Sequence, residues 1–172
     1  MRTSPSDWQS RIDAVWADDA LDGAEVVERV AALAAELPAD DPRGPFELGG
    51  AYDSAGFEAE AAEQYARAVA LGLSGQARAE LDIQYASTLR NLGRHEEAVA
   101  MLRGSRRDPA LGAAPEAFLA LALHSAGRRD EALAVALEAL VPGLPRYQRS
   151  LLGYAAELRD PSGASASGDS AA

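Results

Sequence analysis

The sequence predicts an all-α protein made of antiparallel helix pairs stacked in a short right-handed arc. Three observations support this fold class. Apolar residues recur at helical spacing along most of the 172 residues, alanine is abundant, and a pattern of small and large residues occurs three times. A repeat near 34 residues built from helical hairpins is typical of a solenoid, in which each hairpin buries its apolar face against its neighbours.

Composition favours one soluble domain, because 48% of the residues are hydrophobic and 25% are charged. The absence of cysteine excludes disulfides and thiolate metal sites. The net charge of −11 lies entirely in residues 1–63, which carry 15 acidic and 4 basic side chains. This field disfavours nucleic-acid binding. We interpret it as a solvated acidic face, with a docking patch for a basic partner as the alternative.

The chain starts without the apolar core of a signal peptide, and no later apolar run reaches about 18 residues. We therefore expect a cytoplasmic protein with no membrane partner.

Residues 7–37 are expected to form a degenerate N-terminal helix pair. The first helix carries an apolar stripe, and the second ends at Pro38; the stripe residues are Trp8, Ile12, Val15 and Trp16. Asp18, Asp19 and Asp22 lie between the two helices. They lack the alternating oxygen ligands of a calcium loop, so we interpret them as helix-capping acids.

Three repeat units are predicted at residues 43–73, 76–106 and 114–142, each centred on a turn glycine. Gly56, Gly93 and Gly127 are 37 and 34 residues apart, so three extra residues fall in the first junction, near residues 73–76. Glycine suits the positive φ that often ends a helix. Small residues at fixed offsets from each glycine let the two helices of a hairpin approach closely.

The first unit resembles the tetratricopeptide repeat (TPR) family at seven positions: Leu48, Gly49, Tyr52, Gly56, Ala61, Tyr65 and Ala68. The second and third units match more loosely, because Leu89 and Leu123 replace an aromatic residue and Ala136 replaces a later one. In length, and in residues 81–102, the chain is similar to small stand-alone bacterial TPR proteins, a group thought to self-associate. The resemblance implies a module that binds other proteins.

A C-terminal amphipathic helix at residues 145–159 is expected to cap the last repeat. Together the helical elements would form one domain over residues 1–160. Residues 161–172 consist of small and polar residues, and we expect them to be a disordered tail.

Candidates for catalysis are few, so we predict a non-enzyme with no cofactor and no metal. His95 and His124 fall in different hairpins, and neither has a second ligand at metal spacing. A small-molecule enzyme is the weakest alternative. It would require Asp53, Arg90 and His124 to converge in one deep pocket.

The resemblance implies a concave groove lined by the first helix of each hairpin. The residues it places there are Arg43, Phe46, Asp53, Glu80, Ile83, Ser87, Arg90, Asn91, Leu121 and His124. Phe46, Ile83 and Leu121 would form an apolar strip flanked by Arg90, Asn91 and His124. In the alternative register, Phe46 or Ile83 belongs to the core. The family's chaperone clamp requires Lys and Asn where this chain has Phe46, Glu47, Gly50, Glu80 and Gln84, so we expect no such clamp.

The sequence thus predicts a non-catalytic interaction module that holds a partner peptide or helix in this groove. The alternative is a self-associating homodimer with a structural role. Its interface would bury aromatic residues of the end elements, namely Trp8, Trp16, Tyr147 and Tyr154.

Overall fold

The computed structural model describes residues 5–160, and the tail expected at residues 161–172 lies outside this range. Within it the chain forms nine α-helices, two short 3-10 helices and no strand. The α-helices are α1 (Pro5–Trp16), α2 (Gly23–Ala34), α3 (Arg43–Ser54), α4 (Glu58–Ala70), α5 (Gly75–Asn91), α6 (His95–Gly104), α7 (Ala114–Ser125), α8 (Arg129–Leu140) and α9 (Gln148–Arg159). The 3-10 helices are η1 (Pro109–Leu111) and η2 (Val141–Gly143). The predicted all-α class is confirmed.

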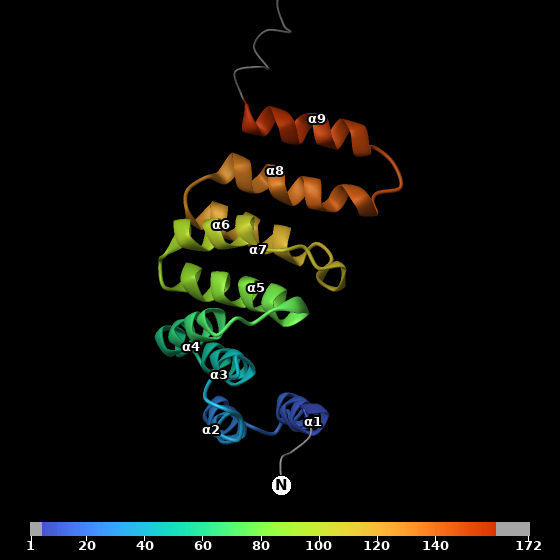
Figure 1. Cartoon of the computed structure of the whole chain (residues 1–172). Coiled ribbons are helices and arrows are strands. Elements are labelled where there is room, and N and C mark those ends of the chain that lie inside the picture. The colour runs from blue at the N-terminus through green and yellow to red at the C-terminus, as the bar shows by residue number, and fades with distance from the viewer. Residues whose placement is uncertain (1–4, 161–172) are drawn as a thin grey trace, which may run out of the picture.

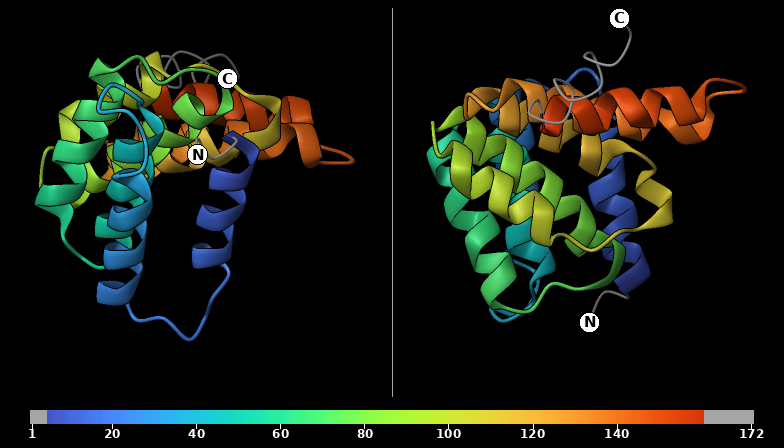
Figure 2. Two further views of the ribbon diagram at one scale, coloured as in Figure 1. Left: turned by 60° about the horizontal axis from the view of Figure 1, so that its bottom comes forward. Right: turned by 90° about the horizontal axis from the view of Figure 1, so that it is seen from above.

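The helices stack in chain order from α1 to α9, and each packs against the next (Figure 1). Two further views show that the direction of the helices rotates from one hairpin to the next, so the stack is curved (Figure 2). First helices of successive hairpins also touch, because α3 contacts α5 and α5 contacts α7, whereas α4, α6 and α8 make no comparably extensive contacts with one another. The inner layer is therefore α3, α5 and α7, and its exposed side is called the concave face below.

The turn glycines end their helices as the sequence predicts. Gly56, Gly93 and Gly127 have φ values of 79°, 76° and 80°. At the first turn the Phe57 N–H donates to the Tyr52 carbonyl at 2.9 Å, and the Gly56 N–H donates to the Asp53 carbonyl at 3.1 Å. Equivalent bonds occur at the other two turns. These pairs are the Schellman motif, which satisfies the last carbonyls of a helix and requires a left-handed residue.

Close approach within the first repeat depends on Gly49. A Cβ at this position would lie 2.6 Å from Cδ1 of Tyr65, whose ring is fully buried. The missing side chain lets α3 and α4 pack with the ring between them. This contact is the physical reason for a small residue seven positions before the turn glycine.

The core consists of three apolar clusters, one for each pair of neighbouring units. The N-terminal cluster includes Trp8, Ile12 and Val30, and the central cluster includes Phe46, Tyr65 and Leu81. The C-terminal cluster spans α5 to α8 and includes Ile83, Leu89, Val99, Leu102 and Leu123.

Two expectations about the N-terminal helices are corrected or refined. Trp16, expected on the apolar stripe of α1, is 40% exposed, and its ring lies against Gly50 and Glu47 of α3. Asp22 does cap a helix: its side chain accepts from the Glu25 N–H at 2.9 Å, and the Glu25 carboxylate accepts from the Asp22 N–H. This reciprocal arrangement is a capping box.

The last helix, α9, begins at Gln148, three residues later than the sequence predicts. Tyr147 directly before it has a φ of 69°, a left-handed conformation that keeps the helix from extending further toward the N-terminus. Ala155 of α9 is fully buried, and Arg159 forms a bidentate ion pair with Glu138 of α8 at 2.7 Å. Residues on the opposite side of α9, such as Arg149, Gly153 and Glu157, are exposed.

Candidate functional site

The N-terminal half of the concave face is acidic and contains an exposed indole. Trp16 of α1 extends over α3, where a Cβ on Gly50 would lie 3.5 Å from its ring, and its Nε1 donates to Glu47 at 2.9 Å. Asp13 and Glu80 are close enough to interact electrostatically with Glu47. None of the ion pairs within residues 5–160 includes any of these three carboxylates.

The pKa of Glu47 is raised, first by burial and then by the charges of Asp13 and Glu80, while the bond from Trp16 acts in the opposite direction. A carboxyl group with a raised folded-state pKa favours folding most when it is protonated in both states. Its contribution is lost as the pH rises through the folded-state pKa. Ionised Glu47 therefore destabilises this region relative to its protonated form.

We expect Glu47→Gln to be more stable than the wild type at pH 7, because glutamine still accepts the indole N–H and carries no charge. The gain should shrink as the pH falls toward the ordinary glutamate value of 4.5. Urea unfolding of the variant and the wild type at several pH values measures this difference in the free energy of unfolding. Glu63→Gln on the exposed side of α4 is the control, and an equal, pH-independent gain in both variants would contradict the prediction.

Asp53 and Glu80, both predicted for the groove, lie farther along the acidic half. Asp53 accepts a hydrogen bond from Thr88 Oγ1 of α5 at 2.8 Å, and burial is the main cause that raises its pKa. Glu80 accepts from Gln76 at 2.8 Å. The buried Tyr65 hydroxyl donates to Gln84 Oε1 of α5 at 3.1 Å, and burial strongly raises the pKa of Tyr65. These bonds join α3, α4 and α5 beneath the face.

The C-terminal half of the concave face is formed by α7 and the end of α5. Leu121 is 50% exposed, and Ala117 and His124 on the same side of α7 are also exposed. On α5, Asn91 is exposed and accepts from Arg90 Nη2 at 3.2 Å. Arg90 is half-buried, and its Nε is buried without a partner among the described residues. Ser87 is also half-buried. This half therefore combines an apolar side chain with neutral and basic polar groups.

The predicted apolar strip of three residues is wrong, because only Leu121 is exposed. Phe46 and Ile83 are each 8% exposed and belong to the central and C-terminal clusters. Arg43 also has a structural place: its guanidinium pairs with Asp41 at 2.6 Å and lies 5.2 Å from the centre of the Trp8 ring. The predicted groove residues do not include Trp16 or Glu47. Trp16 belongs to α1, outside the three repeats, and Glu47 was considered only as a position of the absent chaperone clamp.

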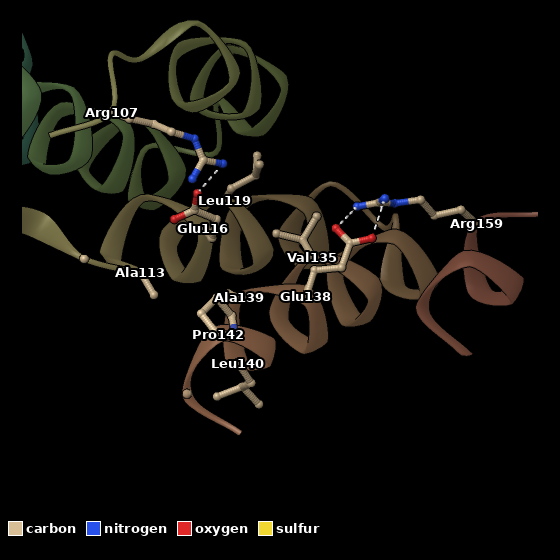
Figure 3. A pocket seen from close by; sticks show the side chains of 12 residues that line it. Arg107, Ala113, Glu116, Leu119, Val135, Glu138, Ala139, Leu140, Pro142 and Arg159 are labelled. Atoms are coloured by element: carbon tan, nitrogen blue, oxygen red, sulfur yellow. Dashed lines mark hydrogen bonds and ion pairs between the residues drawn. The ribbon is translucent and has the colours of Figure 1, made fainter. Parts of the chain in front are cut away.

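A separate apolar hollow of about 700 Å³ lies at the C-terminal end, away from the concave face (Figure 3). Its floor includes Leu119, Val135 and Pro142. Ion pairs of Arg107 with Glu116 at 2.6 Å and of Arg159 with Glu138 at 2.7 Å lie at two sides of it.

Asp53, Arg90 and His124, the residues of the enzyme alternative, do not line this hollow. Among residues 5–160 no group of three or more His, Cys, Asp or Glu side chains is arranged to hold a metal ion. No helix in the described range combines the length and the apolar character that crossing a membrane requires.

Comparison with known families identifies the repeat. A family model described as tetratrico peptide repeat matches residues 42–158, which include all three hairpins and most of α9. A search of curated proteins finds no match. Repeats of this family act as protein-interaction modules, and the helix pairs, turn glycines and inner layer described above have the arrangement expected of them. The chain therefore belongs to the tetratrico peptide repeat family.

Proposed function

We propose that this protein is a non-catalytic interaction module whose concave face binds an extended or helical segment of a partner protein. One observation carries the proposal. Leu121 exposes half of its side chain on the concave face, whereas Leu123, two residues later in the same helix, is fully buried. An exposed apolar side chain beside polar groups is typical of an anchor at a protein interface.

The charges of the face support a particular kind of partner. Glu47, Asp53 and Glu80 are not paired with basic side chains of the described chain, and the partly exposed Trp16 indole lies beside Glu47. A segment with basic residues at one end would complement these carboxylates, and its cations could also pack on the indole. An apolar residue at the other end of the segment would contact Leu121.

Site-specific photo-cross-linking tests this proposal with a matched control. A photoreactive residue replaces Leu121 on α7 in one protein and Leu133 on α8 in another. Both leucines are 50% exposed, but α8 is not one of the inner-layer helices α3, α5 and α7. We expect cross-links to a partner from position 121 and not from position 133, and Leu121→Asp should weaken binding of that partner at least tenfold.

Equal cross-linking from both positions, or an unchanged affinity of Leu121→Asp, would contradict the concave-face assignment. A cross-linked product made of two copies of this chain would support the second candidate function, self-association. That candidate is favoured by Tyr147, directly before α9, and by Tyr154 on α9, which are 78% and 61% exposed. Trp8 cannot contribute to it, because it is 1% exposed.

A further inference from the structure

A cavity of about 450 Å³ lies between the first turn of α5 and the segment that follows α6. One wall is the α4–α5 junction, where the three extra residues of the first junction fall, together with Arg78, Ala79 and Asp82 of α5. The opposite wall contains Arg106 and Arg107. None of these residues belongs to the predicted concave groove, so the cavity is separate from the proposed partner-binding face.

Arg78 is held in place at the cavity by a buried carboxylate. Its Nε donates to Asp82 Oδ1 at 2.8 Å, and Asp82 is only 4% exposed. This bond is made by Nε and does not involve either Nη group of Arg78. A guanidinium oriented by a buried partner loses little freedom when it binds an oxyanion with the other edge of its planar fork.

Arg106 and Arg107 provide two more guanidinium groups from the other wall. Arg106 is exposed, and Arg107 is 85% exposed at its side chain while pairing with Glu116. The two carboxylates of the cavity have other roles, because Asp82 orients Arg78 and Asp108 accepts from the Ala110 N–H at 2.9 Å. The three arginines of the cavity therefore outnumber its two carboxylates, although the whole chain carries a charge of −11.

The backbone at the start of α5 adds to this positive potential. Ser74 occupies the N-cap position, but its side chain makes no capping bond, unlike Asp22 of α2. The first N–H groups of this 17-residue helix are thus not capped by a side chain, and helix N-termini favour anions. Gly75 has a φ of 67°, and no atom would lie within 4 Å of a Cβ there, so the approach to this turn is open.

We propose that this cavity binds a phosphate group, held by Arg78 and Arg106 and by the first-turn N–H groups of α5. The arginines would supply charge-assisted hydrogen bonds to a tetrahedral dianion. The phosphate has two possible sources with the same chemistry: free inorganic phosphate, or a phosphorylated side chain of a partner. The proposal does not depend on the function assigned to the concave face.

Titration with inorganic phosphate, followed by ¹⁵N NMR of the full-length protein, tests the site. We expect saturable shifts of the Arg78 Nε–H signal and of the backbone amides of residues 75–78, which sodium chloride at equal ionic strength does not produce. Arg106→Gln should weaken this binding about tenfold. Arg149→Gln on α9 removes the same charge at an exposed position outside the cavity, and its affinity should match that of the wild type.

A second variant tests the role of Arg78 without leaving a buried charge unpaired. Arg78→Gln combined with Asp82→Asn keeps a hydrogen-bonding pair and should abolish the shifts, while circular dichroism confirms that the protein is folded. The proposal is overturned if sodium chloride reproduces the shifts, or if Arg106→Gln and Arg149→Gln bind phosphate equally. A phosphoserine peptide that binds more tightly than free phosphate identifies a phosphorylated partner as the source, and equal affinity identifies free phosphate.

Discussion

Replacing Trp8 by alanine should lower the stability of the N-terminal unit by about 3–5 kcal/mol, the range found for aromatic truncation in a core. The indole is 1% exposed and packs in the cluster with Ile12 and Val30. Its Nε1 donates to the Leu33 carbonyl at 2.8 Å, and the Arg43 guanidinium lies over its ring at 5.2 Å. The substitution thus removes packing, a buried hydrogen bond and a cation–π contact together.

The expected consequence is local, because each unit of a solenoid contacts only its neighbours. Amide hydrogen exchange should show lost protection in α1 and α2 and unchanged protection in α7 and α8. Trp16→Ala is the matched control on the same helix. Its ring is 40% exposed, so the loss of protection should be clearly smaller. Equal losses for the two tryptophans would refute the burial argument.

Replacing Leu123 by alanine should cost about 2–5 kcal/mol of the free energy of unfolding. Leu123 is fully buried in the C-terminal cluster, which also contains Leu89 of α5 and Val135 of α8, so its truncation leaves a cavity in this cluster. The cluster spans α5 to α8, the helix pairs of two successive repeats. The substitution therefore weakens the contact between repeats as well as the packing within one hairpin.

Leu121→Ala provides the comparison two residues away in the same helix. Because Leu121 is 50% exposed, its truncation should change the free energy of unfolding by no more than about 0.5 kcal/mol. Urea unfolding of the three proteins, followed by circular dichroism, measures both effects. Similar losses for the two leucines would mean that α7 is rotated from the orientation described here, and would also remove the basis for the concave-face proposal.

The repeat architecture could be predicted from local signals in the sequence. Each turn glycine adopts the left-handed conformation that its place after an apolar helical stripe indicates. Gly49 is small where its partner, Tyr65, is large, and the structure places the two in contact. These features depend on neighbours within a single hairpin, so helical periodicity and spacing were sufficient.

The candidate site was predicted less well, because it depends on how one hairpin sits on the next. Leu121 and Phe46 occupy comparable inner helices, yet Leu121 is 50% exposed and Phe46 is 8% exposed. Phe46 packs with Tyr65 and Leu81, a residue of the following helix α5, and is thereby covered. The two residues lie at different offsets, ten residues before Gly56 and six residues before Gly127, and the repeat pattern alone does not say which offset stays exposed.

The sequence by itself determined the helices, their glycine-ended turns and the all-α stacked fold, because these follow from interactions between residues close along the chain. Only the tertiary structure decided which inner-helix residues stay exposed. It also placed the Trp16 indole beside Glu47 and gathered Arg78, Asp82 and Arg106 around one cavity. The reason is physical: exposure and charge clustering arise from contacts between helices far apart in the sequence, which local periodicity does not specify.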